Sequence, residues 1–261
     1  MAEAQHYEIY AIKYAHHERP ARENFIGGDP HDGPMPLDYF VWLVRNAERT
    51  LVVDTGFSAA TAARRQRMHL RCPTEGLRML GVEAAGVRDV VITHLHYDHV
   101  GNFDLFPAAT FHLQDDEMRY ATGRHMRHEV FGGAFDVEDV VGMVRNVYRG
   151  RVHFHDGDTV PFPGISLHRI GGHTLGLQVV RVATRRGWVV LASDASHFYA
   201  NMEQVRPFPI VYSVADMVAG YARLRALAES PQHIIPGHDP KVMERYPAPR
   251  RDLEGVVVRL D

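Results

Sequence analysis

The chain has 261 residues, a formal net charge of −3 and 45% hydrophobic residues, which is enough to build a sizeable core. The slight negative charge argues against nucleic acid as a partner, and no apolar run is long enough to cross a bilayer. The N-terminus lacks a basic region followed by an apolar segment, and Cys72 is the only cysteine. We therefore expect no secretory signal, no intrachain disulfide, no membrane partner and a cytoplasmic location.

The first third of the chain reads as strands separated by loops and two helices. Strands are predicted at residues 7–14, 37–44, 50–53 and 89–92. Helices are predicted at residues 59–70 and 73–80. Residues 16–36 are rich in Gly, Pro, Asp and His and predict a long loop, which in a compact domain often has a function. The strand at 50–53 runs directly into Asp54-Thr55-Gly56.

The rest of the chain carries a mostly helical segment followed by more strands. Residues 114–149 have a helical pattern broken at Gly123 and at Gly132-Gly133, and we interpret them as an insertion. This insertion is either a lid that shapes a pocket or a structural pair of helices. Strands are predicted at residues 110–113, 152–154, 165–170, 177–182, 188–193, 233–235 and 255–260. A helix is predicted at residues 214–228, and the absence of any linker-like segment favours one domain over residues 1–261.

The most informative stretch is Thr93-His94-Leu95-His96-Tyr97-Asp98-His99, which follows the predicted strand at 89–92. Alternate residues share a face of an extended chain, so His94, His96 and Asp98 can point to one side while His99 serves a second centre. Imidazole and carboxylate groups are ligands for borderline divalent metals. One loop cannot complete a metal site, so it needs partners from elsewhere in the chain.

Three later strands also end in potential ligands, which are His173, Asp194 and His238. Loops at one end of a sheet commonly form active sites because rigid strands hold them. The ligands then divide into a set of His94, His96 and His173 and a set of Asp98, His99 and His238. Asp194 is suited to bridge the two sets because a carboxylate has two oxygens. Two metals about 3.5–4 Å apart can hold a hydroxide between them and polarise a carbonyl or phosphoryl oxygen.

These motifs resemble those of the metallo-β-lactamase superfamily, and within it the N-acyl homoserine lactonase-like hydrolases. The resemblance extends over about residues 7–240. Its elements are H-x-H-x-D-H at 94–99, G-H-T-x-G at 172–176, the aspartate Asp194, the G-H-D at 237–239 and the D-T-G at 54–56. It implies an α/β fold, an αββα sandwich of two mixed β-sheets flanked by helices, with Asp54 supporting a ligand histidine.

The resemblance also implies an activity. We expect a metal-dependent hydrolase that opens the ring of an N-acyl homoserine lactone or a related lactone by attack of a metal-bridging hydroxide. The expected cofactors are two divalent ions per chain, zinc first, with manganese, cobalt or iron as alternatives. Asp98 and Asp194 would serve catalysis as well as metal binding. The expected partner is a small-molecule substrate, and the chain could also form a homodimer.

The chain departs from the family at one position. Well-studied lactonases of this group place a tyrosine three residues after the bridging aspartate, where this chain has His197, with Tyr199 two residues further on. We expect His197 to take the role of that tyrosine, because an imidazole can donate a hydrogen bond or a proton near neutral pH. Tyr199 is the second candidate, and a bound water that protonates the leaving group is the third.

Other functions remain open at this point. The fold could support hydrolysis of an ester, amide or thioester, or redox chemistry at iron as in persulfide dioxygenases. Flavodiiron proteins fit less well, because they usually have glutamate where this chain has His96. A nuclease is disfavoured because the basic pairs Arg64-Arg65, Arg185-Arg186 and Arg250-Arg251 are scattered and are expected to face solvent. A non-catalytic binding module is disfavoured because the ligand set is complete.

Overall fold

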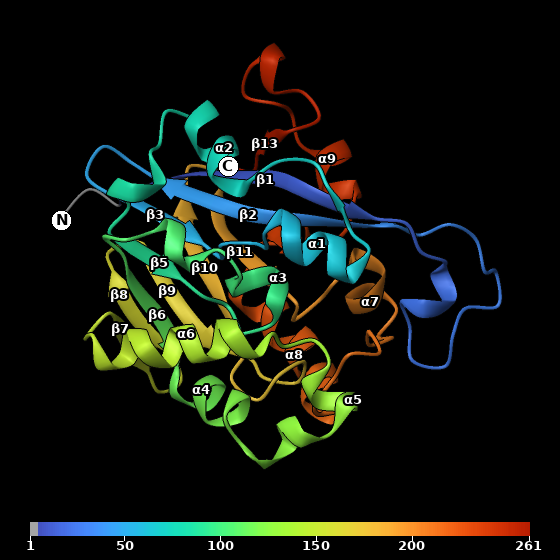
Figure 1. The fold of residues 1–261 in the computed structure, drawn as a ribbon. Helices are drawn as coiled ribbons and strands as arrows, with labels where there is room; N and C mark the ends of the chain where they lie inside the picture. Colours follow the sequence, from blue (N-terminus) through green and yellow to red (C-terminus); the bar gives the residue numbers. More distant parts are fainter. Residues whose placement is uncertain (1–4) are drawn as a thin grey trace.

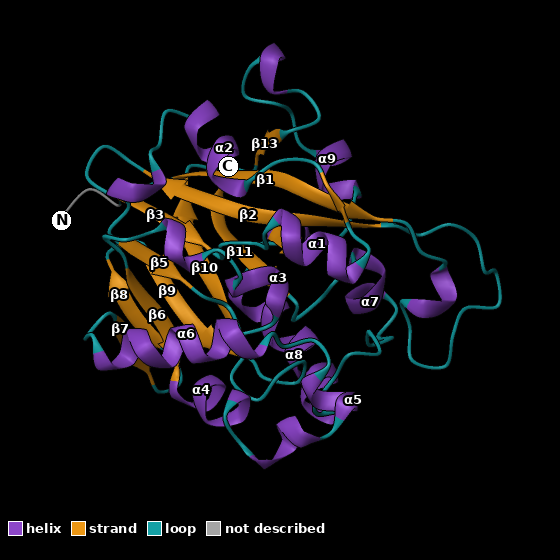
Figure 2. Ribbon diagram, viewed as in Figure 1, coloured by secondary structure: helices purple, strands orange, loops and turns teal. Residues whose placement is uncertain are grey.

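Two β-sheets lie face to face at the centre of the molecule, with helices on their outer faces (Figures 1 and 2). A computed structural model describes residues 5–261, so the first four residues of the N-terminus, to which the expectation about a secretory signal applies, lie outside the described part. Both sheets are mixed, which confirms the predicted αββα sandwich.

The first sheet combines an antiparallel half with a parallel half. Its strands, in spatial order, are β13 (Val257–Arg259), β1 (Glu8–His17), β2 (Leu37–Arg45), β3 (Thr50–Val53), β5 (Asp89–Val91), β6 (Thr110–Gln114) and β7 (Val152–His155). The short β4 (Met68–His69) also pairs with β1. Strands β3, β5, β6 and β7 run parallel to one another, and the remaining pairs are antiparallel.

The second sheet is smaller and mostly antiparallel. Its strands, in spatial order, are β12 (Ile234–Pro236), β11 (Gly187–Ser193), β10 (Gln178–Thr184), β9 (Ile165–Arg169) and β8 (Thr159–Phe162). Only β11 and β12 are parallel. Gln178 at the start of β10 joins the two sheets, because its side-chain amide donates to the carbonyl oxygens of Ile92 (2.9 Å) and His112 (3.0 Å).

Helices cover both outer faces of the sandwich. The first sheet is covered by α1 (Ala59–Arg65), α2 (Pro73–Met79), α3 (Tyr97–Val100) and α6 (Val137–Tyr148) (Figure 2). The second sheet is covered by α8 (Val214–Leu227). The remaining helices are α4 (Asp115–Ala121), α5 (Glu129–Gly132), α7 (Tyr199–Glu203) and α9 (Lys241–Arg245). The segment that was expected to be helical, 114–149, thus contains α4, α5 and α6.

The layers follow from the two-residue period of a strand, which β2 shows clearly. Its side chains at Tyr39, Val41 and Leu43 pack in the core beneath α1, α2 and α6. The intervening Phe40 and Trp42 belong to the core cluster that also contains side chains of β10 and β11 in the second sheet. A strand with both faces buried is almost continuously apolar, as β2 is.

Three local features differ from the sequence-based expectations. The helix predicted at 59–70 ends at Arg65, because Gln66 adopts a left-handed conformation (φ 56°) and the chain turns into β4. Strands β4 and β8 are not predicted by the pattern. The first is only two residues long, and the second contains Pro161, which is tolerated because β8 is an edge strand. Among the described helices, none is both long and apolar enough to cross a membrane.

Candidate metal centre

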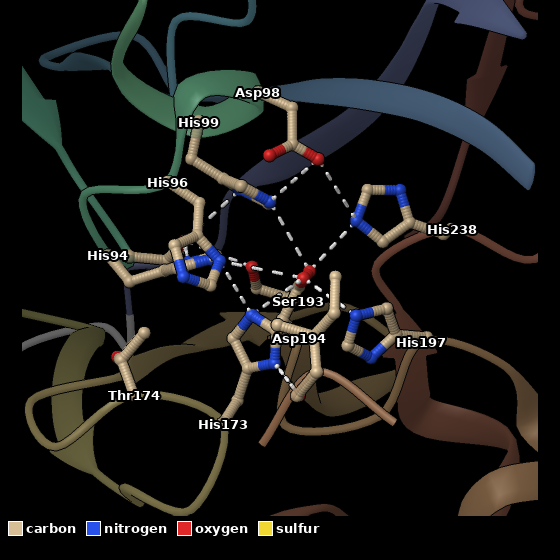
Figure 3. A network of polar contacts seen from close by, with 12 residues as sticks. His94, His96, Asp98, His99, His173, Thr174, Ser193, Asp194, His197 and His238 are labelled. Atoms are coloured by element: carbon tan, nitrogen blue, oxygen red, sulfur yellow. Dashed lines mark hydrogen bonds and ion pairs between the residues drawn. The ribbon is translucent and has the colours of Figure 1, made fainter. Parts of the chain in front are cut away.

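Four strand ends bring the candidate ligands to one edge of the sandwich. The chain leaving β5 supplies the first motif, in which His96 is extended and Asp98 and His99 lie in α3. The loop after β9, the end of β11 and the loop after β12 supply the rest (Figure 3). We call the group the metal-ligand cluster. It consists of His94, His96, Asp98, His99, His173, Asp194 and His238, all nine-tenths or more buried.

Three imidazole nitrogens converge in the first half of this cluster. His96 Nδ1 lies 3.0 Å from His94 Nε2 and 2.9 Å from His173 Nε2. Nitrogens bound tetrahedrally to zinc at about 2.0–2.1 Å are roughly 3.3 Å apart, so these three atoms are spaced almost as metal ligands would be. Together with Asp194 they form a group able to hold one divalent ion.

The second half consists of Asp98, His99 and His238. Asp98 Oδ2 lies 3.6 Å from His99 Nε2 and 3.8 Å from His238 Nε2. His99 Nε2 is buried and has no hydrogen-bond partner among the described residues. A buried polar atom without a partner is costly, so a nitrogen that lies near two carboxylates and makes no hydrogen bond is suited to bind a cation.

Asp194 lies between the two halves and turns one oxygen toward each (Figure 3). Its Oδ1 is 2.9 Å from His238 Nε2 and 3.3 Å from His99 Nε2. Its Oδ2 is 3.2 Å from His173 Nε2 and 3.8 Å from His94 Nε2. This is the geometry that a bridging carboxylate requires.

The far side of three imidazoles is held by a fixed acceptor. His173 Nδ1 donates to the Ile210 carbonyl oxygen (2.7 Å) and His238 Nδ1 to the Asp38 carbonyl oxygen (3.0 Å). His99 Nδ1 donates to Asp54 Oδ2 (2.7 Å), as the resemblance implied for Asp54. Each bond places the ring proton on Nδ1 and leaves the lone pair of Nε2 facing the centre of the cluster.

Protonation differs between the halves. Burial holds the pKa values of His94 and His96 well below the usual range and lowers the pKa of His173 to about 3. These rings are therefore neutral, as metal ligands must be. Burial also lowers the pKa values of His99 and His238, but nearby carboxylates, Asp194 foremost, outweigh burial and raise both. The same carboxylates would attract a divalent cation in place of those protons.

Glycines allow the ligand loops to pack this closely. A Cβ on Gly237 would lie 2.8 Å from Asp194 Oδ1, and a Cβ on Gly172 would lie 2.6 Å from the backbone nitrogen of Met217. Gly172 also has a positive φ of 84°, which side chains rarely adopt. The glycines preceding His173 and His238 are therefore needed to place those rings.

Glu117 is a supporting residue that the sequence analysis missed. This fully buried residue in α4 accepts hydrogen bonds from Leu95 N (2.9 Å), Thr174 Oγ1 (2.6 Å) and Gly176 N (3.1 Å). Burial raises its pKa to about 7, against the effect of these donors. The carboxylate ties the loop of His94 and His96 to the loop of His173. The only signal in the sequence is an acidic residue in the first turn of a predicted helix.

His197 reaches the cluster, whereas Tyr199 does not. His197 Nε2 lies 2.9 Å from Asp194 Oδ2, and its ring stacks on Phe208 at 3.7 Å between centroids. Tyr199 is buried beneath the guanidinium of Arg245 at 3.7 Å and does not line the cavity beside the cluster. The geometry therefore favours His197 over Tyr199.

A cavity of about 240 Å³ opens onto the cluster. Gly133 and Ala134 of the helical segment 114–149 line it, but Met118 and Met126 do not. Phe135 packs instead against the edge of the His96 ring, with centroids 4.5 Å apart. The segment thus contributes backbone to the cavity wall and an aromatic side chain that supports a candidate ligand.

Arginine side chains form another part of the wall, which the sequence analysis did not anticipate. Arg65 was expected to face solvent with Arg64, yet Arg65 lines the cavity together with Arg19 and Arg67. Arg64 does point outward and pairs with Asp136. Residues 64 and 65 diverge because neighbouring positions on a helix face different directions.

Comparisons with known proteins agree with this fold. A family model for the metallo-beta-lactamase superfamily matches residues 35–238. A probable metallo-hydrolase of Mycobacterium tuberculosis is 26% identical in an alignment of 226 positions that covers 78% of this chain and 72% of the relative. The N-acyl homoserine lactonase AttM of Rhizobium johnstonii is 30% identical in an alignment of 183 positions that covers 65% of each chain.

Solved structures give the same fold at lower identity. The crystal structure of a quorum-quenching N-acyl homoserine lactone lactonase superposes with a TM-score of 0.75 at 20% identity, covering 92% of this chain and 95% of the other. AidC, a dizinc quorum-quenching lactonase, superposes with a TM-score of 0.69 at 16% identity, covering 91% and 89%. The chain belongs to the metallo-β-lactamase superfamily, and it is a metal-dependent hydrolase of that superfamily.

Proposed function

We propose that this protein is a dinuclear metal-dependent hydrolase that opens a lactone ring. The observation that carries the proposal is the position of Asp194, whose two oxygens face separate sets of ligands. The names of relatives as N-acyl homoserine lactonases support a lactone as the substrate class. Zinc fits the nitrogen-rich donor set best, with manganese, cobalt or iron as alternatives.

Two divalent ions held by the metal-ligand cluster would supply activation of a water and polarisation of the lactone carbonyl. The reaction consumes one water, breaks the bond between the acyl carbon and the ring oxygen, and yields a hydroxy acid. At neutral pH the acid ionises, so each turnover releases one proton.

The chain's own residues hold this centre in place before the substrate arrives. His173, His238 and His99 cannot rotate freely, because each Nδ1 is already bound to an acceptor. Asp98 and Asp194 are buried, so their charge acts at short range with little screening by water. This pre-arrangement is the main contribution that a hydrolase scaffold makes at such a centre.

We assign the leaving-group side of the reaction to His197. Burial lowers its pKa, and the adjacent Asp194 opposes that shift, so the neutral ring donates a hydrogen bond to Asp194 Oδ2. The ring lines the cavity and is fixed by stacking on Phe208. In the loaded centre Asp194 Oδ2 would bind a metal ion, and the Nε2–H of His197 could then donate a hydrogen bond to the ring oxygen as that oxygen leaves.

The test is a substrate panel on protein of known metal content. Lactones, phosphotriesters, β-lactams and glutathione thioesters are compared, and lactone opening is followed by proton release with a pH indicator. The expected result is that lactones have the highest kcat/KM. Efficient turnover of β-lactams or thioesters beside inert lactones, in fully loaded protein, would overturn the proposal.

A further inference from the structure

Three arginines line the cavity that opens onto the metal-ligand cluster. Arg19 lies near the start of the long loop between β1 and β2, Arg65 ends α1, and Arg67 precedes β4. Their partly buried side chains approach the cavity that Asp98 and Asp194 also line. A neutral lactone with an alkyl chain offers three guanidinium groups at this position no opposite charge to pair with.

Arg65 and Arg67 are held in place without being neutralised. Arg65 donates to the carbonyl oxygens of Gly133 (3.0 Å) and Phe135 (3.0 Å), and its guanidinium stacks on Tyr97 at 3.9 Å. Arg67 donates from Nε to the Tyr97 hydroxyl (3.2 Å) and from Nη1 to the carbonyl oxygen of Arg65 (2.7 Å). Among residues 5–261, no carboxylate oxygen lies within 4.0 Å of a nitrogen of either guanidinium.

Arg19 is only weakly compensated. Its Nη2 donates to the carbonyl oxygen of Glu23 (2.6 Å), while the Glu23 carboxylate is 3.6 Å from Nε and 49% exposed. An exposed ion pair at that separation does little to neutralise the charge of Arg19. Arg19 Nε is buried and makes no hydrogen bond to any described residue, and the guanidinium lies 5.1 Å from the Phe208 ring. The Phe208 ring also stacks on His197, so Arg19 and His197 pack against the same side chain.

The charge balance of the cavity is therefore positive once the centre is loaded. Two divalent cations would more than offset the two carboxylates of Asp98 and Asp194, and the three arginines would add further positive charge. Guanidinium groups fixed by backbone carbonyls and aromatic rings are pre-organised for the planar, two-oxygen contact made by carboxylate or phosphate. At about 240 Å³, the cavity is also smaller than the roughly 300–1,000 Å³ typical of drug-sized ligands.

We propose that the natural substrate is a compact lactone bearing an oxyanion, a carboxylate or a phosphate, which Arg19, Arg65 and Arg67 bind. This inference rests on the proposed lactonase function and narrows it. The guanidinium groups fix the non-reacting end of the substrate and leave the ring carbonyl to the centre held by Asp194.

The experiment compares pairs of lactones that share a ring and differ in whether the non-reacting end carries an oxyanion. One pair is 5-oxotetrahydrofuran-2-carboxylate and its carboxamide. The other is 5-(hydroxymethyl)-γ-butyrolactone and its phosphate ester, so the pairs separate carboxylate from phosphate as the preferred oxyanion. We expect kcat/KM to be at least about tenfold higher for the anionic member of one pair, since charge-assisted hydrogen bonds are each worth about that much. Equal or lower values for both anionic members would overturn the inference.

Variants then assign the preference to the arginines. Arg67→Met and Arg19→Met should each lower the ratio of kcat/KM for the anionic over the neutral member several-fold, and Arg67→Lys should restore part of it. A merely structural role would lower both members together and leave the ratio unchanged, which would count against the assignment. Arg64→Met is the matched control, because Arg64 is 59% exposed, pairs with Asp136 and lies away from the cavity. It should leave the ratio and the rates unchanged.

Failure of this inference is distinguishable from failure of the proposed function. If the neutral lactones are opened with kcat/KM values equal to or above those of the anionic ones, the lactonase function stands and the oxyanion inference is wrong. If fully loaded protein opens none of the four lactones, the proposed function itself fails.

Discussion

The sandwich contains two groups of buried histidines, and they differ in where their ring nitrogens point. In the β6–β7 histidine group, His112 Nδ1 is 3.1 Å from His155 Nε2, and His112 Nε2 is 3.3 Å from Asp89 Oδ1. His155 Nδ1 is 3.0 Å from Thr159 Oγ1. Each ring nitrogen of these two histidines thus has a polar partner within hydrogen-bonding distance. In the metal-ligand cluster, the nitrogens converge on two carboxylates instead.

The difference shows that the number of histidines does not define a metal centre. Among the described residues, the groups able to hold a metal all lie around Asp194 and Asp98. The β6–β7 histidine group has a single carboxylate, Asp89, which also pairs with Arg49 at 3.1 Å. Convergence and unbalanced negative charge therefore separate a candidate centre from histidines that satisfy one another.

The largest expected effect comes from Asp194. Asp194→Ala removes the one side chain that faces both halves of the cluster, so metal content should fall at both sites. Turnover should fall by more than the roughly 10²–10⁴-fold typical for loss of one acid–base group. Elemental analysis and lactone kinetics measure both quantities.

Asp89→Asn is the matched control, since it alters the carboxylate of the β6–β7 histidine group. It should leave metal content at the wild-type value. Loss of metal from Asp89→Asn, or full retention of metal by Asp194→Ala, would erase the distinction between the two groups.

His197 should show the next largest effect. His197→Ala removes a ring that touches Asp194 from the cavity side, so we expect kcat to fall about 10²–10⁴-fold while metal content stays full. Tyr199→Phe removes only a hydroxyl buried beneath Arg245 and should retain wild-type turnover. Wild-type rates in His197→Ala would remove this residue from the reaction.

Glu117→Gln should weaken metal binding only by changing the position of the ligand loops. An amide cannot accept at every point where the carboxylate now receives Leu95 N, Thr174 Oγ1 and Gly176 N, so the two ligand loops should loosen. Metal affinity should weaken by about 10–100-fold, as for other groups that orient ligands. A chelator competition measures this. Glu138→Gln, an exposed change on α6, is the control, and equal affinities in the two variants would contradict the role of Glu117.

The smallest effect is expected in the β6–β7 histidine group. Burial, with His112 nearby, lowers the pKa of His155 to about 4. The pKa of a histidine in the unfolded chain is about 6.5. As the pH falls from about 6.5 to 4, this residue therefore binds a proton in the unfolded chain while His155 in the folded protein stays neutral. The free energy of unfolding falls as a result. His155→Gln should make that loss shallower without changing metal content. Denaturant unfolding across this pH range measures it, and an unchanged slope would contradict the assignment.

Much of the fold could be predicted because its signals are local. The apolar runs of β2, β5 and β11 and the residues that follow them could be read directly, and the motif contexts supplied the sandwich architecture. Boundaries were less predictable where one residue changes the chain direction, as Gln66 does at the end of α1.

The residues of the metal centre also differ in how far the sequence alone could predict them. Its candidate ligands occur in recognisable motifs, and the structure brings all seven together. Glu117, Arg19 and Arg67 could not be found, because their roles depend on contacts between segments far apart in the chain. Whether His197 or Tyr199 reaches Asp194 also depends on the turn after β11, which the sequence does not specify.

The most direct test of the account is the metal content of active, chelator-free protein measured together with its lactone turnover. Inductively coupled plasma mass spectrometry should give two equivalents of a divalent metal per chain, with activity rising in proportion as metal-free protein is reloaded to that value. Full activity at a reproducible one equivalent would contradict a dinuclear centre bridged by Asp194.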